Sequence, residues 1–533
     1  MAEPLMAAGP APAVPLTRRA SLNVVAFILD LAVKTGVSLV LTPLLVGWLG
    51  TALFGVWEML GRLSGYLAAL GGRPAEALRL VIANRQAAAD GDADHRRALG
   101  AALVVWLIFL PVAVAAAAVM VWAAPAITGA APALYATLRL ATALTLGATL
   151  LAGLAALPES ALHGMNLGYK RMELQAALNV VGGALTAGAV YAGLGLVGVA
   201  GAQIAIAVVS GFCFWALARS YVSWFGATRP ARADSRRLLG LSGWLSGGDL
   251  ISKLLLASDV LILGALVSPA AVTTYVLTAY APRAAVTIHG SVVGAAMPGL
   301  GGLLGQRQYE RAQLVRRELM ALTWLFTTAV GATILLWNRS FVGLWVGAQH
   351  YAGPDVDLLI VLIAVQTAFI RADAYIIDAA LQSWLRVMIS AAATVVTITL
   401  AIALTRAFGL PGLCVGVLAG RTLQTMTYPA LARRCVEDHG PALPLGFARG
   451  LVVTAALFSA ASALGQRLVV SNWLVWAAGV AATLALASGV AFVMGLSRES
   501  QHAVLRRAAE VVRKPRPHPR PPAPRSPPSR PGA

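Results

Sequence analysis

Long apolar runs, separated by short polar segments, fill the sequence between residues 21 and 496. Most runs reach the roughly 20 residues that an α-helix needs to cross a hydrocarbon core about 30 Å thick. The pattern therefore predicts an all-α integral membrane protein with about 14 transmembrane helices. The expected spans lie near 21–46, 53–75, 98–123, 133–157, 171–192, 195–218, 241–267, 271–298, 314–337, 357–383, 387–406, 410–432, 447–466 and 472–496.

Composition agrees with a membrane environment. Hydrophobic residues make up 58% of the 533 residues and charged residues only 12%, too few to cover the surface of a soluble protein. The net charge of +19 arises mainly between the apolar runs and in the tail, a placement that favours anionic lipid headgroups over nucleic acid. Three cysteines, Cys213, Cys414 and Cys435, are far apart and predict neither a disulfide framework nor a zinc site.

Loop charges indicate the orientation of the chain. With the N-terminus inside, the inner loops contain paired basic residues such as Arg96 and Arg97. The outer loops contain little more than Arg339, Arg406 and Arg467. Because cytoplasmic loops are enriched in lysine and arginine, we expect both termini in the cytoplasm.

Three short matches recur in the same order in the two halves of the chain. The clearest is Asp-Leu-x-x-Lys, which begins at Asp30 and again at Asp249, 219 residues later. Spans 1–6 and 7–12 are therefore predicted to be parallel six-helix repeats, an architecture of alternating-access transporters, with two helices outside the repeat. The matching segments are 30–34 with 249–253, 159–163 with 378–382, and 195–198 with 409–412.

The repeat also predicts the domain organisation. The C-terminal tail contains a basic amphipathic segment at 499–514, and from 515 it is rich in proline and arginine and expected to be disordered. The expected units are a cytoplasmic N-terminal segment (1–20), a first lobe (21–222), a basic cytoplasmic linker (223–240), a second lobe (241–435), two additional transmembrane helices (447–496) and a basic cytoplasmic tail (499–533).

Several segments resemble the polysaccharide exporters and O-antigen flippases of the multidrug/oligosaccharidyl-lipid/polysaccharide exporter superfamily. The resemblance covers most of residues 20–435. The dipeptide Arg73-Pro74 departs from the small apolar residues of the family, so the second span is expected to bend differently. The segments that carry the resemblance are 44–50, 53–57, 70–72 and 77–79, and 341–347 with Tyr351.

This resemblance implies two lobes in a V around a central cavity. It implies a flippase that moves undecaprenyl-pyrophosphate-linked oligosaccharide from the inner to the outer leaflet of the bacterial inner (cytoplasmic) membrane. Such a protein would serve the biosynthesis of surface polysaccharide, lipopolysaccharide O-antigen included. Its expected partners are membrane lipids, the lipid-linked glycan, and a polysaccharide polymerase or glycosyltransferases.

Cations inside the expected spans are the candidate substrate-binding residues. A charge near the bilayer centre costs at least about 2.5–3.5 kcal/mol, so it needs a partner, a cavity or a function. Arginine presents a planar fork and lysine a mobile charge, and both can replace the hydration of a diphosphate headgroup. These candidates are Lys34, Arg62, Lys253, Arg283 and Arg371.

Acids accompany several of these cations at i,i+4 spacing, which places each pair on one helix face. The pairs are Asp30 with Lys34, Glu58 with Arg62, and Asp249 with Lys253. For any one pair, a purely structural role is an equal alternative. Asp259 has no counter-ion nearby in the sequence and is the preferred site for uptake of H⁺ or Na⁺. The ion-coupling candidates are Asp30, Glu58, Asp249 and Asp259, and we expect no metal and no other cofactor.

Enzyme motifs are not apparent in the sequence. We find no P-loop and no grouping of a nucleophile with a base, and His289 has no spaced partner for a metal. We therefore expect a transporter without catalytic residues. The alternatives within the fold are a lipid II flippase-like protein and a drug/cation antiporter. The alternative from another class is a multi-span membrane glycosyltransferase or polymerase.

Overall fold

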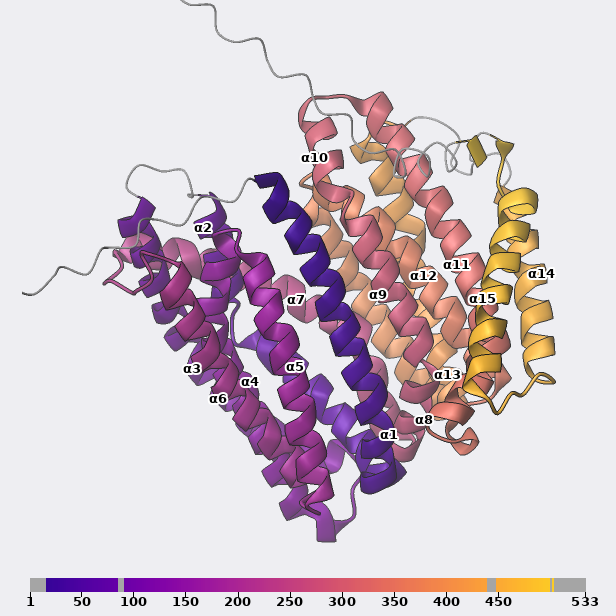
Figure 1. Cartoon of the computed structure of the whole chain (residues 1–533), viewed down its shortest axis with the longest axis horizontal. Coiled ribbons are helices and arrows are strands. Elements are labelled where there is room, and N and C mark those ends of the chain that lie inside the picture. Colours follow the sequence, from indigo (N-terminus) through magenta and orange to yellow (C-terminus); the bar gives the residue numbers. More distant parts are fainter. Residues whose placement is uncertain (1–15, 85–90, 439–446, 499–500, 503–533) are drawn as a thin grey trace, which may run out of the picture.

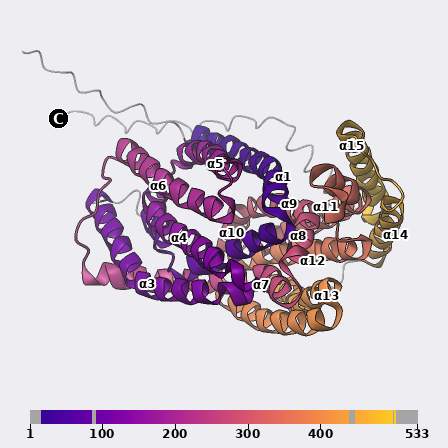
Figure 2. The same ribbon diagram turned by 90° about the horizontal axis from the view of Figure 1, so that it is seen from below.

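The computed structural model describes residues 16–84, 91–438, 447–498 and 501–502, and every regular element in these ranges is a helix. Residues 1–15 of the predicted N-terminal segment (1–20), most of 499–514 and all of 515–533 lie outside the described residues. The helices form two groups that lie side by side (Figures 1 and 2). The all-α, two-lobe fold class predicted from the sequence is confirmed.

The first lobe contains the N-terminal half of the chain. Its longest helix is kinked at Gly50, where φ is 77° and the helical path is interrupted, so that it comprises the first two expected spans. The elements are α1 (Leu16–Leu70), α2 (Pro74–Asn84), α3 (Gly91–Ile127), η1 (Pro132–Leu134), α4 (Tyr135–Gly164), α5 (Gly168–Tyr191) and α6 (Gly195–Tyr221).

The second lobe repeats this order of elements. A 3₁₀ turn again precedes the fourth span. A kink at Gly409 (φ 62°) joins the fifth and sixth spans of this lobe in one long helix, whereas the kink at Gly50 joins the first and second spans of the other lobe. The helix α7 begins within the range assigned to the linker. The elements are α7 (Arg232–Leu266), α8 (Pro269–Thr278), α9 (Tyr280–Gly294), α10 (Met297–Gly305), α11 (Tyr309–Trp345), η2 (Ala348–His350), α12 (Pro354–Ala379) and α13 (Ser383–Cys435).

Two further helices, α14 (Phe447–Gly465) and α15 (Trp473–Val490), lie at the outer edge of the second lobe (Figure 1). A short η3 segment (Ala491–Gly495) follows α15. Phe458 of α14 and Ala487 of α15 pack with Leu335 of α11 in one apolar cluster. These helices are therefore additions to the second lobe.

Eleven helices in the described ranges are long and apolar enough to cross a membrane. Two of them, α1 and α13, each contain two of the expected spans. The helix α7 is not among the eleven, because Asp249, Lys253 and Asp259 fall along its apolar part. Together these three helices account for the difference from the 14 spans predicted.

One sequence match corresponds to a repeated structural contact. At the end of α4, Glu159 forms an ion pair with Arg171 at the beginning of α5. At the end of α12, Asp378 Oδ1 lies 2.7 Å from Nε of Arg386 at the beginning of α13. Each acid thus ties the fourth span of its lobe to the fifth, as expected for related repeats.

The lobes are joined where the kink of α1 lies against α8, toward the lower edge of Figure 1. Nearer to α2, the first turns of α7 also pack against the first lobe. Thr273 of α8 donates a hydrogen bond of 2.6 Å from Oγ1 to the carbonyl of Thr51. Trp345 of α11 donates one of 2.7 Å from Nε1 to the carbonyl of Leu39. Backbone acceptors of α1 therefore hold the two lobes together at this end.

Candidate functional site

The second half of α1 runs along α7 and brings polar residues of both lobes together. Tyr66 donates a hydrogen bond of 3.2 Å to Ser258 Oγ, and Lys253 Nζ donates one of 2.8 Å to the carbonyl of Gly65. These contacts place the second expected span beside the seventh. The charged residues in the second half of α1 and the middle of α7 consequently lie at the interface between the lobes.

Asp259 of α7 lies at the centre of this interface. The sequence places no counter-ion near Asp259, and the structure supplies one from another helix, because Arg283 Nη2 of α9 lies 3.2 Å from Asp259 Oδ2. Tyr275 of α8 donates a second bond of 2.7 Å to the same oxygen, and the backbone N–H of Val260 bonds the other oxygen at 2.9 Å. The Arg283 guanidinium also lies over the Tyr275 ring, 5.2 Å from its centroid. The partner is 24 residues away and comes from another helix, so spacing along one helix could not reveal it.

Arg62 and Glu58 of α1 lie on the first-lobe side of Asp259. Their charged atoms are 3.8 Å apart, at the loose end of the range for an ion pair. The Nε atom of Arg62 is buried and has no hydrogen-bond partner among the described residues. Arg62 acts electrostatically on Asp259, and Glu58 acts on Arg283. Arg62 therefore has hydrogen-bond donors that Glu58 does not engage.

Arg421 of α13 completes the group, and sequence reasoning missed it. Its side chain is only 4% exposed, and it donates hydrogen bonds of 2.9 Å to Thr367 Oγ1 and 3.1 Å to the carbonyl of Leu255. It has no ion-pair partner in the described ranges, but it acts electrostatically on Asp259. The available signal was a lone arginine inside an apolar run.

Arg371 of α12 extends the positive charge further. Its guanidinium lies close to Gly290 of α9, where a Cβ would be 3.4 Å from Nη1, and it acts electrostatically on Arg421. We call the resulting set the inter-lobe arginine cluster. It consists of Arg62, Arg283, Arg371 and Arg421 with the acids Glu58 and Asp259.

The cluster has four arginines and two acids, so it favours an anion over a cation. Its members are not all equally accessible, because the side chains of Arg62 and Arg283 are 29% and 35% exposed, whereas Arg421 is buried. Arg62 and Arg283 can therefore contact a ligand directly. Arg421 can only add to the local field.

Two predicted residues lie outside the cluster, nearer to α2. Lys253 Nζ lies 3.0 Å from Asp249 Oδ2, and Arg73 Nη1 lies 3.2 Å from Asp249 Oδ1. Arg73 follows Gly72, whose φ of 75° ends α1 before α2 begins. The departure from the family pattern at Arg73 thus supplies a second cation to Asp249.

The predicted pairing of Asp30 with Lys34 is wrong. Asp30 Oδ1 instead accepts a hydrogen bond of 3.2 Å from Asn179 Nδ2 of α5. The Lys34 side chain is exposed and forms no ion pair with any residue that the structure describes. Sequence similarity between 30–34 and 249–253 therefore does not extend to the contacts of these residues.

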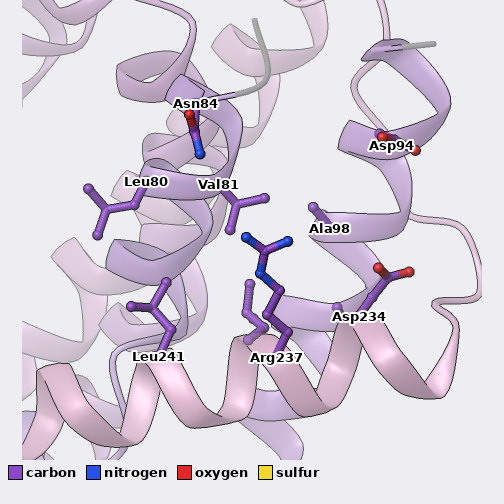
Figure 3. A pocket seen from close by; sticks show the side chains of 10 residues that line it. Leu80, Val81, Asn84, Asp94, Ala98, Asp234, Arg237 and Leu241 are labelled. Carbon is purple, nitrogen blue, oxygen red and sulfur yellow. The ribbon is translucent and has the colours of Figure 1, made fainter. Parts of the chain in front are cut away.

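A cavity of about 320 Å³ lies elsewhere, between α2, α3 and the first turns of α7. Figure 3 shows Arg237 extending from α7 into this space, with Asp234 and Asp94 to one side and Val81 above it. Neither the cluster nor any predicted site residue lines it. This cavity is consequently separate from the site between the lobes.

Solved structures with the same fold are membrane transporters. The lipid II flippase MurJ in an inward closed conformation matches with a TM-score of 0.61 at 12% identity, over 89% of this chain and 99% of that chain. An inward-facing multidrug resistance MATE family transporter of the MOP superfamily matches with a TM-score of 0.56 at 15% identity, over 81% and 99%. The eukaryotic MATE transporter AtDTX14 matches with a TM-score of 0.55 at 15% identity, over 79% and 98%. At these identities the likeness concerns the fold alone.

Sequence comparison identifies the family directly. No curated protein sequence matches the chain. A family model described as polysaccharide biosynthesis protein matches residues 23–301, which is more than half of the chain and includes α1 to α9. The chain is a multi-pass membrane protein that belongs to the polysaccharide biosynthesis protein family.

Proposed function

We propose that this protein is a flippase for oligosaccharides linked to undecaprenyl pyrophosphate. The observation that carries the proposal is the excess of arginine over acid in the inter-lobe arginine cluster. A diphosphate must lose hydration to cross the bilayer, and fixed guanidinium groups can replace water at its oxygens. The family match supports a role in polysaccharide biosynthesis.

Arg62 and Arg283 are the residues that contact the diphosphate in this proposal. Arg62 is held loosely by Glu58 and its side chain is 29% exposed, so it can bind a phosphate oxygen without first breaking a strong pair. Arg283 must be shared with Asp259, which lies 3.2 Å away. Binding of the headgroup therefore competes with the ion pair between α7 and α9. Lys253 and Lys34 lie apart and would act earlier on the path.

The direction of transport follows from the loop charges. We propose that the edge at which α2 and α10 lie faces the cytoplasm, because the basic inner loops adjoin these helices. At the opposite edge the kink of α1 is hydrogen-bonded to α8 (Figure 1). The headgroup would enter from the inner leaflet, and separation of α1 from α8 would release it to the outer leaflet of the bacterial inner membrane. A polymerase or ligating glycosyltransferase would then take the glycan.

Two alternatives share parts of this account. A lipid II flippase-like protein remains a candidate because lipid II also presents a diphosphate, which the cluster would bind in the same way. A drug/cation antiporter fits less well, since a site for organic cations needs an excess of acid and the cluster has the opposite balance. A membrane glycosyltransferase would form a glycosidic bond, which a transport assay can detect as a change in product.

The proposal is tested with the full chain in proteoliposomes that carry a fluorescent undecaprenyl-pyrophosphate oligosaccharide. We expect protein-dependent transfer of the label between leaflets without any change in its chemical structure. Arg406→Ala is the matched control, because Arg406 is an exposed arginine of α13 outside the cluster. Transfer that requires formation of a longer glycan would contradict the proposal, and transfer of lipid II alone would favour the first alternative.

A further inference from the structure

The eighth span is broken between α8 and α9, directly before Arg283. In a continuous helix the carbonyl of Thr278 would accept a hydrogen bond from the N–H four residues later. That residue is Pro282, which has no N–H. Asn338 of α11 replaces the missing donor, because its Nδ2 donates a hydrogen bond of 2.9 Å to the carbonyl of Thr278.

The same amide group also contacts a buried acid. Asn338 Nδ2 lies 2.7 Å from Asp357 Oδ1 of α12, and Tyr351 donates a hydrogen bond of 3.0 Å to Asp357 Oδ2. Asn338 is 2% exposed and Asp357 is 1% exposed. The carbonyl of Thr278 and Asp357 Oδ1 both accept from the amide nitrogen of Asn338, so the orientation of this amide is fixed. The Oδ1 atom of Asn338 is left buried without a partner in the described chain.

Asp357 differs from the other buried acids because no cation balances it. Asp259 faces Arg283, and Asp373 faces Arg316 Nη2 at 3.2 Å. Within the described ranges no lysine, arginine or histidine forms an ion pair with Asp357, and its hydrogen-bond donors are neutral. The N-terminus of α12 contributes only a partial positive charge.

The side chains that bond Asp357 in the described ranges carry no positive charge. From α11, Arg339 acts on Tyr351 but forms no pair with the acid, and the exposed Asp355 of α12 adds negative charge near Tyr351. From η2, His350 is buried, and this burial lowers the pKa of its imidazole, which favours the neutral form. From α8, Thr278 is neutral, and its hydroxyl accepts a bond of 3.0 Å from the N–H of Ala352.

We propose that Asp357 is a proton-binding site of this protein. An ionised carboxylate without a counter-ion is unfavourable in a buried position, and a proton is the smallest cation that removes the charge. The site lies outside the inter-lobe arginine cluster, at the end of the second lobe where η2 connects α11 to α12. No ion-coupling residue expected from the sequence belongs to it.

Proton binding at Asp357 affects the inter-lobe arginine cluster through Asn338. One amide nitrogen serves both Asp357 and the orphaned carbonyl of Thr278, and a carboxyl that carries a proton is a weaker acceptor. The nitrogen has two hydrogens, one for each acceptor, so protonation loosens Asn338 from Asp357 and changes how firmly Asn338 holds the break between α8 and α9. Arg283 follows five residues after Thr278 on α9, so its position relative to Asp259 depends on the same break. This last step rests on the proposed function, whereas proton binding itself does not.

Infrared difference spectroscopy of the purified full chain in lipid nanodiscs tests the site without any substrate. Spectra recorded at acidic and alkaline pH should contain a protonated-carboxyl band that Asp357→Asn removes. Asp355→Asn is the matched control, since it removes an exposed acid two residues away in the same turn, and it should leave the band intact. A band that persists in Asp357→Asn would overturn the proposal.

A second variant keeps the carboxyl and guards against misfolding of the first. Tyr351→Phe removes one donor to the ionised form, so the band should titrate at higher pH than in the unmodified protein. An unchanged midpoint would overturn the proposal. Suppression of the band by Na⁺ at constant pH would indicate a Na⁺ site if Asp357→Asn removed this sensitivity to Na⁺. That result would also overturn the proposal of a proton site. Proton binding with no flipping activity would contradict the proposed function and leave this site standing.

Discussion

Gly55 of α1 packs so closely against Pro269 of α8 that a Cβ on Gly55 would lie 1.8 Å from the carbonyl oxygen of Pro269. The obstructing atom belongs to the backbone, so no side-chain rotation can make room for it. Thr273 on the same face of α8 bonds the backbone of Thr51, which ties the two helices together at this point. The contact therefore requires glycine and joins the two lobes at this point.

We expect Gly55→Ala to push α1 and α8 apart. Distances between spin labels placed on the two lobes near this end should become longer or broader in the variant. Gly61→Ala is the control, because nothing lies within 4 Å of a Cβ at Gly61 on the same half of α1. Identical distance distributions in the two variants would show that this contact does not close the lobes.

A second prediction concerns the ion pair between Asp259 and Arg283. Arg283→Ala leaves the buried Asp259 without its cation, so it should lower thermal stability more than Arg283→Ala combined with Asp259→Asn. Pairs in direct contact show coupling of about 0.5–3 kcal/mol in such cycles, although the partly exposed Arg283 favours the lower end. Additive effects of the two substitutions on the unfolding free energy would contradict the pairing.

The contacts of Asp30 give the opposite expectation for Lys34. Asp30→Asn and Lys34→Ala should act additively, within about 0.5 kcal/mol, because the two side chains do not pair. Asp30→Asn and Asn179→Ala should instead be coupled, since Asn179 donates the hydrogen bond to Asp30. Coupling of Asp30 with Lys34 and none with Asn179 would restore the pair that the spacing predicted.

Arg421 is expected to matter for stability as well as for transport. Arg421→Ala removes two buried hydrogen bonds, to Thr367 and to Leu255, and leaves their acceptors to be satisfied elsewhere. The loss should be about 1–3 kcal/mol and should appear as lower expression and a lower melting temperature. The exposed Arg406→Ala should change neither. Equal behaviour of the two variants would mean that Arg421 is dispensable for folding.

The sequence predicted the fold well because each span is a local signal. The length of an apolar run identifies a transmembrane helix from about 20 residues of sequence, and the repeat at a shift of 219 identifies the two lobes. It underestimated the polarity of α7, in which three charged residues interrupt the apolar run. It also missed that α7 begins within the predicted linker and that the eighth span is broken into α8 and α9.

The site was predicted less completely, because partners on different helices leave no spacing in the sequence. The pairs of Glu58 with Arg62 and Asp249 with Lys253 follow i,i+4 spacing and form. Asp30 obeys the same rule and nevertheless bonds Asn179, since tertiary packing brings α5 closer. The partner of Asp259 comes from another helix, and it became visible only when α7 and α9 were placed together.

The most direct test of the central claim is the affinity of the purified protein for undecaprenyl pyrophosphate compared with uncharged undecaprenol. The unmodified protein should bind the diphosphate at least about tenfold more tightly, since one charge-assisted contact contributes about 1.5–3 kcal/mol. A variant with both Arg62→Ala and Arg283→Ala should lose this preference, and Arg406→Ala should retain it. Equal affinities in the unmodified protein, or a preference that persists in the double variant, would contradict binding of the diphosphate by the inter-lobe arginine cluster.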